Sequence, residues 1–151
     1  MNQEQRKALV KFGSAVQELM NCGVIRSHRY LGDIAEYLCA DEFGINLESN
    51  LREVGHDGVI NNSRVQIKFG GGKKTNVDLG NPEAYDEVLI VLGKESVVRT
   101  YTSDADFLVY RMTASEVRAL GTTKAGKYSC GSSQFAGKPD RAISLLSEKD
   151  A

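Results

Sequence analysis

Hydrophobic and polar residues alternate strictly in one stretch near the middle of the chain. The apolar members are Val65, Ile67 and Phe69, and the polar members between them are Arg64, Gln66 and Lys68. A period of two places the two sets on opposite faces of a β-strand. Asn61-Asn62 precedes this stretch and fits a two-residue turn, because Asn tolerates positive φ. The pattern predicts a hairpin with strands near 56–60 and 64–69, in which Ile60 pairs with Ser63 and Asp57 falls opposite Gln66.

Helical spacing of apolar residues precedes the hairpin twice. The first segment, residues 3–21, carries the apolar stripe Leu9, Phe12, Val16, Leu19 and Met20 and ends near Gly23. The second, residues 30–43, carries Leu31, Ile34, Ala35 and Leu38 and ends at Gly44. Spacings of three and four are typical of a buried helix face, and glycine commonly follows the last helical turn. Two helices are therefore predicted, each with one buried face.

The pattern after the hairpin predicts a sheet and a short helix. Residues 88–92 form a continuous apolar run, as in a central strand covered on both faces. Further predictions are a flexible loop at 70–76, strands near 97–102 and 107–112, a helix opened by the capping box Thr113–Glu116 and running through Leu120, and loop over 121–140. The order predicts an α/β fold with a mixed central sheet flanked by helices. We expect a single domain over 1–151, with a helical extension at 1–29, a core at 30–92 and an irregular tail at 121–151.

Composition narrows the class of protein. The chain has 151 residues, of which 41% are apolar, enough for one folded domain. No apolar run is long enough to cross a membrane, and the N-terminal residues lack the features of a signal peptide. The cysteines Cys22, Cys39 and Cys130 are odd in number and scattered, which predicts a reducing, cytoplasmic location and no zinc site.

Charge is nearly balanced overall but unevenly distributed. The formal net charge is -1, so nothing in the total favours nucleic acid. The segment from Asp33 to Asp57 is rich in acids, whereas the basic residues Arg64, Lys68, Lys73 and Lys74 follow without an acid among them. This distribution is compatible with metal-dependent work on phosphates and equally with ordinary surface charge.

The candidate chemistry lies on the polar face of the hairpin. Asp57, Gln66 and Lys68 are expected within a few ångströms of one another, where they could hold a hard metal ion and a phosphate. A solvated polar face of an edge hairpin is the alternative. Glu36 on the second helix lies one turn from the small residues Gly32 and Ala40, which would let the helix approach the sheet closely. The alternative for Glu36 is a solvated position.

A helix with Gly-x-x-x-Glu, then Asp on one strand, then Gln-x-Lys on the next resembles the PD-(D/E)XK nuclease superfamily. The pattern is most similar to Mrr-type restriction endonucleases and related small nuclease-like domains, and it covers residues 30–92. The matching positions are Glu36, Asp57, Gln66 and Lys68. Two features depart from the family pattern: His56 stands where a proline often precedes the aspartate, and Gln66 replaces the first acid of the (D/E)XK motif.

The resemblance implies a restriction-endonuclease-like sheet and hydrolysis of DNA phosphodiesters. Mg²⁺, with Mn²⁺ as a substitute, would be bound by Asp57, Gln66, the carbonyl of Ile67 and Glu36, while Lys68 would act on the attacking water. The residues expected to contact nucleic acid are Lys73, Lys74 and Arg64. A homodimer would supply the two sites that double-strand cutting needs. The alternatives are a catalytically silent module that binds nucleic acid or a protein, and an RNA-directed nuclease, since nothing here distinguishes RNA from DNA.

Overall fold

The computed structural model of the chain describes residues 1–49 and 55–145. Its elements, in chain order, are α1 (Gln3–Asn21), α2 (Tyr30–Phe43), β1 (Asn46–Leu47), β2 (Gly58–Ile60), β3 (Ser63–Gly70), β4 (Val77–Gly80), β5 (Glu87–Gly93), β6 (Phe107–Thr113), α3 (Ala114–Ala119), β7 (Tyr128–Cys130), the 3-10 helix η1 (Ser132–Phe135) and β8 (Arg141–Ile143). Within these residues, no helix is long and apolar enough to cross a membrane.

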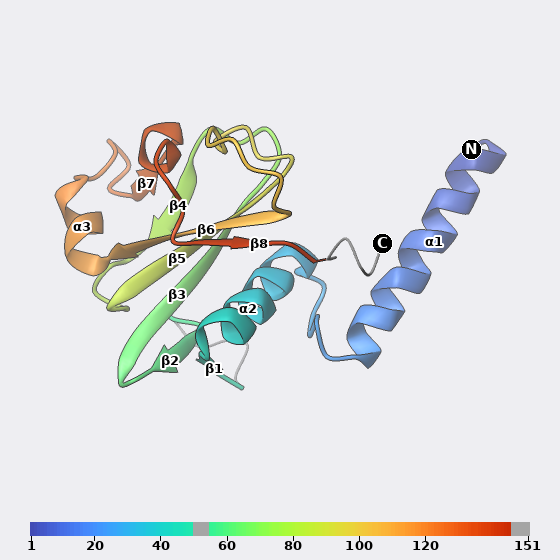
Figure 1. The fold of residues 1–151 in the computed structure, drawn as a ribbon, viewed down its shortest axis with the longest axis horizontal. Helices are drawn as coiled ribbons and strands as arrows, with labels where there is room; N and C mark the ends of the chain where they lie inside the picture. The colour runs from blue at the N-terminus through green and yellow to red at the C-terminus, as the bar shows by residue number, and fades with distance from the viewer. Residues whose placement is uncertain (50–54, 146–151) are drawn as a thin grey trace.

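A mixed sheet of six strands forms the centre of the molecule, in the order β1-β2-β3-β5-β6-β8 (Figure 1). The strands β3 and β5 run parallel, with Ile67 opposite Leu89, and the other pairs are antiparallel. The strands β4 and β7 make a separate small sheet. The α/β class with a mixed sheet and flanking helices is thus confirmed.

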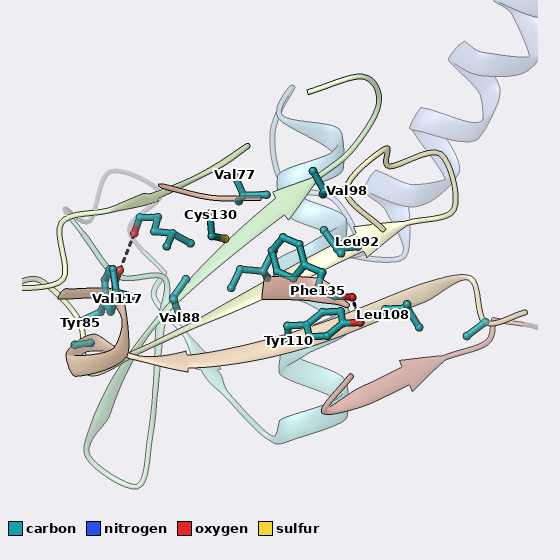
Figure 2. Packing of buried hydrophobic residues seen from close by; sticks show 14 residues of the cluster. Val77, Tyr85, Val88, Leu92, Val98, Leu108, Tyr110, Val117, Cys130 and Phe135 are labelled. Carbon is teal, nitrogen blue, oxygen red and sulfur yellow. Dashed lines mark hydrogen bonds between the residues drawn. The ribbon is translucent and has the colours of Figure 1, made fainter. Parts of the chain in front are cut away.

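The strand β5 lies between two hydrophobic layers, as its continuous apolar run predicts. All seven of its residues are buried. Leu89 and Val91 pack in one cluster with Ala35 and Cys39 of α2. Val88, Ile90 and Leu92 pack on the opposite face in a second cluster, which includes Val117 of α3, Tyr110 of β6 and Phe135 of η1 (Figure 2). Covering both faces excludes water from the centre of the sheet. Burial of each large aliphatic side chain stabilises the fold by about 1.5–3 kcal/mol.

The helix α1 differs from its prediction in burial. Its bounds agree with residues 3–21, and Asn2 and Gln5 form a capping box at its start. None of its residues is buried, however, and Leu9 and Phe12 are 58% and 54% exposed. In Figure 1 the helix extends away from the sheet, and the edge of the Phe12 ring contacts Tyr30 at 5.7 Å between centroids. The expectation of a buried stripe on α1 is therefore wrong.

Other predictions fail where tertiary contacts replace local pattern. Residues 97–102 form a short turn followed by irregular backbone instead of a strand. The Arg99 guanidinium donates to the carbonyls of Ser103, Ala105 and Asp106, which folds the loop on itself. Leu31 is 57% exposed, so it is not part of the buried face of α2. The region 121–140, predicted as loop, contains β7 and η1, and β8 follows it. The strands β1 and β4 were also not predicted. The end of the expected tail, 146–151, lies outside the described residues.

Candidate functional site

The hairpin of β2 and β3 forms as its sequence predicts. Asn61 and Asn62 have φ values of 47° and 64° and form the turn, and Ile60 pairs with Ser63. Both residues adopt the left-handed conformation that a two-residue hairpin requires. The register places Asp57, the residue directly before β2, beside Gln66.

The strand β3 continues beyond the end of β2, and this difference in length creates an open edge. Pairing with β2 stops at Gly58–Val65, whereas β3 pairs with β5 as far as Gly70. Because alternate residues direct their backbone groups to the same side of a strand, Ile67 presents its N–H and C=O where Val65 faces β2. Among residues 1–49 and 55–145, no strand pairs with the backbone N–H and C=O that Ile67 directs to this edge.

Asp57 occupies this open edge. Its Oδ2 accepts hydrogen bonds from the Ile67 N–H at 2.7 Å and from Gln66 Nε2 at 2.9 Å. Its own N–H donates to the Val65 carbonyl at 2.8 Å. The next residue, Gly58, lets β2 lie close to β1, since a Cβ at position 58 would be only 2.8 Å from the carbonyl oxygen of Asn46. The Asp57 carboxylate thus replaces a missing strand at one point of the edge.

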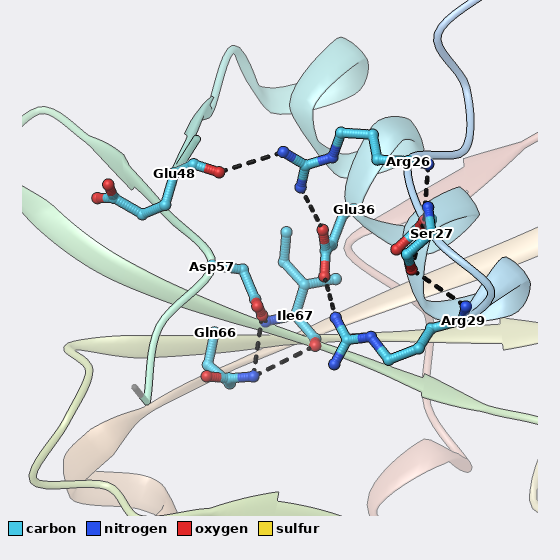
Figure 3. Close-up of polar contacts among 9 residues, drawn as sticks. Arg26, Ser27, Arg29, Glu36, Glu48, Asp57, Gln66 and Ile67 are labelled. Carbon is cyan, nitrogen blue, oxygen red and sulfur yellow. Dashed lines mark hydrogen bonds and ion pairs between the residues drawn. The ribbon is translucent and has the colours of Figure 1, made fainter. Parts of the chain in front are cut away.

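Glu36 reaches the same place from α2. The helix approaches the sheet through Ala35 and Cys39, both fully buried against Val65 and Ile67. This is the apolar face of β3, so Glu36 does not lie on the polar face that carries Gln66 and Lys68. The residue is only 5% exposed, and its carboxylate lies near Asp57 and the Ile67 carbonyl at the open edge (Figure 3). Side chains from both faces of the sheet can approach one another at this edge, because the pairing of β2 with β3 ends at Gly58–Val65.

Two arginines that the sequence analysis did not single out belong to the site. Arg26 donates to Glu36 Oε2 at 2.8 Å, and Arg29 contacts Glu36 Oε1 at 3.4 Å. Figure 3 shows both guanidinium groups directed at this carboxylate. They come from the loop that connects α1 to α2. The spacing Arg-Ser-His-Arg directly before a helix with an inward-facing glutamate was the available signal.

Asp33 holds the loop that carries these arginines. Its Oδ2 accepts from the backbone N–H groups of Arg26 and Ser27 at 2.7 and 2.6 Å, and from the Ser27 hydroxyl at 3.0 Å. The residue is 2% exposed, and within residues 1–49 and 55–145 its Oδ1 has no hydrogen-bond partner. Asp33 therefore anchors the backbone at the start of α2.

The surroundings of both candidate carboxylates disfavour their charge. Burial, followed by the negative charge of Asp57, raises the pKa of Glu36, while Arg26 and Arg29 act against this shift. Burial also raises the pKa of Asp57, opposed by the Ile67 hydrogen bond and by the charges of Lys68 and Arg29. Two carboxylates close enough to affect each other, with cations around them, are typical of sites that bind a metal ion or handle protons.

Lys68 lies on the polar face of β3, where its ammonium is close to Gly80 of β4. It lines a cavity of about 220 Å³ together with Lys74 and Asn76. Lys73 is an exposed neighbour in the same loop.

Arg64 lies near the start of β3 and is bound to Asp86. Its backbone N–H donates to one Asp86 carboxylate oxygen at 2.7 Å, and its guanidinium lies 3.3 Å from the other.

The donors at the open edge suit a hard cation. Asp57, Glu36, the Ile67 carbonyl and the Gln66 amide offer oxygen ligands, which Mg²⁺ prefers. The described residues contain no group of three His, Cys, Asp or Glu side chains that could hold a metal ion, so Gln66 would have to contribute. Its Nε2 lies 2.9 Å from Asp57 Oδ2 and 3.5 Å from the Ile67 carbonyl. Rotation of this amide would bring Oε1 to the point on which both oxygens converge.

No protein-family model matches the chain, and no curated protein matches it.

Proposed function

We propose that the protein is a metal-dependent endonuclease that hydrolyses DNA phosphodiesters, of the restriction or defence type. The observation that supports this function is the convergence of Glu36, Asp57 and the Ile67 carbonyl on the open edge of β3, with Lys68 on the adjoining face. These are the positions that the resemblance to the PD-(D/E)XK superfamily assigns to the active site. Charged groups preorganised around one point can stabilise the charge that develops on a transferred phosphate.

Each residue has a role that fits its environment. Mg²⁺ or Mn²⁺, when bound by Asp57, Gln66, Ile67 and Glu36, would acidify a water and offset charge on the phosphate. Lys68 would orient the attacking water, since its ammonium is a compact donor within electrostatic reach of Asp57. Contacts from exposed lysines position a duplex without reading its sequence. The residues proposed for such contacts are Lys73 and Lys74, with Arg64 at the edge of the region.

A silent nuclease-fold module that binds nucleic acid or a protein is the second candidate. The contacts of the site favour it in one respect, because each acidic group already has partners within the chain. Gln66 donates to Asp57, and Arg26 and Arg29 bind Glu36. An amide oxygen is also a weaker magnesium ligand than a carboxylate.

Incubation with plasmid DNA, single-stranded DNA and RNA, each in Mg²⁺ and in Mn²⁺, separates the two candidates. We expect cleavage of DNA by the wild type and loss of at least about 100-fold in Asp57→Asn and Lys68→Met, because each removes a charge that acts on the transition state. Lys124→Met, at an exposed turn, is the matched control. Binding without any cleavage in either metal would favour the silent module, and cleavage of RNA alone would replace DNA as the substrate.

We also propose that the protein is a cytoplasmic homodimer formed through α1. Most of the stability of a helix in a protein comes from packing of its apolar face, and no residue of the 19-residue helix α1 is buried. The apolar residues Leu9, Phe12, Val16 and Leu19 are spaced three, four and three apart, and this series is the same in both directions. Two antiparallel copies would therefore place Leu9 against Leu19 of the partner subunit, as a two-fold interface requires. The small residues Gly13 and Ala15 beside this stripe would permit close approach of the two helices.

A further inference from the structure

The two arginines at Glu36 are held unequally. Arg26 makes two hydrogen bonds, to Glu36 Oε2 at 2.8 Å and to the Glu48 carbonyl at 3.1 Å, and its side chain is 31% exposed. Arg29 makes one long contact, 3.4 Å to Glu36 Oε1, and its side chain is 66% exposed. Arg26 therefore makes the shorter and better buried ion pair with Glu36. Within residues 1–49 and 55–145, most donors of the Arg29 guanidinium therefore have no acceptor and are available to another one.

Arg29 and Lys68 flank Asp57 from different sides. Arg29 comes from the loop before α2, and in Figure 3 its side chain extends toward Asp57 and the Ile67 carbonyl. Lys68 comes from the polar face of β3, opposite to the face that α2 covers. Both cations lower the pKa of the Asp57 carboxyl against the effect of its burial. Arg29 and Lys68 thus place two cations beside the Asp57 carboxylate, where they could attract an anion.

We infer that Arg29 is a phosphate-binding residue, whose guanidinium turns from Glu36 to a phosphodiester of a nucleic-acid strand lying along the open edge of β3. This inference rests on the proposed function in requiring a nucleic-acid ligand. A guanidinium forms paired hydrogen bonds with two phosphate oxygens, which suits a backbone contact better than the single point charge of a lysine. Arg26 stays with Glu36 when Arg29 moves, so no buried carboxylate is left without a cation.

The backbone around Arg29 is already in place for this role. The Arg29 carbonyl accepts from the Asp33 N–H at 2.9 Å, and the Asp33 carboxylate in turn holds the preceding turn of the loop. The Arg29 N–H donates to the Ser27 hydroxyl oxygen at 3.1 Å. Only the exposed side chain has to reorient, so binding would order few additional groups.

Fluorescence anisotropy with a short labelled DNA duplex, in EDTA and over a series of salt concentrations, tests the inference without catalysis. We expect Arg29→Ala to weaken binding about 10-fold and to reduce the slope of log Kd against log salt by about one, as for the loss of one phosphate contact. Arg29→Lys should keep part of the affinity, because it retains the charge without the paired geometry. Arg118→Ala, which removes an arginine of α3 that is bound to Glu83, is the control and should leave binding unchanged.

Unchanged affinity and slope in Arg29→Ala would overturn the inference, as would a wild type that binds no nucleic acid. Arg29→Gln keeps most of the side chain and replaces the alanine variant if that variant does not fold, as judged from its thermal transition. Cleavage is scored separately. Weakened binding in a protein that cuts nothing would leave the phosphate site standing without the nuclease, whereas cleavage that does not depend on Arg29 would do the reverse.

Discussion

At the scale of single residues, Glu36 and Asp57 carry a conflict between burial and charge. Burial raises the pKa of both carboxyl groups, from ordinary values of 4.5 and 3.8. The native state then binds these protons more tightly than the unfolded state does. The stability that protonation contributes is present at low pH and is lost as pH rises through the raised pKa.

This sign can be checked with Glu36→Gln, whose position 36 does not titrate. We expect the free energy of unfolding of the wild type, minus that of the variant, to increase as pH falls from neutral through the raised pKa of Glu36. The difference should become constant below the ordinary value of 4.5. Denaturant unfolding at a series of pH values measures it, and the subtraction cancels exposed groups such as Asp86, whose pKa is lowered by Arg64. If this difference instead decreased as pH fell, the charges of Arg26 and Arg29 would lower the pKa of Glu36 by more than burial raises it.

The contacts of Gln66 lead to a second prediction at this scale. Its amide lies between Asp57 and the Ile67 carbonyl, so Gln66→Glu should add a charged ligand at that point. We expect binding of Mg²⁺ or Mn²⁺ to tighten at least about tenfold, because affinity rises with the number of charged ligands. Isothermal titration calorimetry measures the change. Gln3→Glu on the exposed start of α1 adds the same charge elsewhere. Equal or weaker affinity in Gln66→Glu would show that residue 66 does not face the metal.

At the scale of elements, the hairpin determines where the site forms. The turn at Asn61-Asn62 sets the register, and the register sets which residues of β2 lie beside the open edge of β3. A shift by one residue would move Asp57 to the other face and separate it from Gln66. The site therefore depends on two asparagines that take no part in its chemistry.

Substitution at the turn tests this dependence. Asn62 has a φ of 64°, which a β-branched residue adopts only with strain. We expect Asn62→Val to lower the free energy of unfolding by about 1–2 kcal/mol, and Asn62→Gly to preserve or increase it. Thermal or urea unfolding measures both variants. If valine and glycine gave equal stability, the turn would not have the left-handed conformation on which the register rests.

At the scale of the whole molecule, α1 is the feature that the rest of the fold leaves uncovered. The apolar stripe of α1 does not pack on the sheet, because the two hydrophobic clusters already cover both faces of the sheet. Cutting both strands of a duplex requires two sites of opposite polarity, and a two-fold dimer through α1 would provide them.

Light scattering at micromolar concentration tests the dimer. We expect Leu9→Lys to weaken association at least about tenfold, because it places a charge against Leu19 of the partner subunit in the proposed apolar seam. Val10→Lys is the matched control, since Val10 is 72% exposed and lies outside the stripe. A wild type that is monomeric with and without DNA would contradict the dimer and leave nicking or single-strand cutting as the nuclease activities consistent with one site.

The sequence by itself determined the features that depend on neighbouring residues. The bounds of α2, the turn at Asn61-Asn62, the capping box of α3 and the central strand β5 follow from spacing and conformational preference over a few positions. The same local alternation placed Asp57 beside Gln66. Propensity, capping and register act over short distances along the chain, so these predictions needed no knowledge of the fold.

Only the tertiary structure decided how distant segments meet. The approach of Glu36 to Asp57 depends on α2 packing against β3, and the positions of Arg26, Arg29 and Asp33 depend on a loop that reaches the same edge. The exposure of the α1 stripe, and the short strands β1, β4, β7 and β8, likewise have no local signature. An apolar stripe indicates that a surface needs covering but does not identify what covers it. That choice follows from the free energy of packing the whole chain.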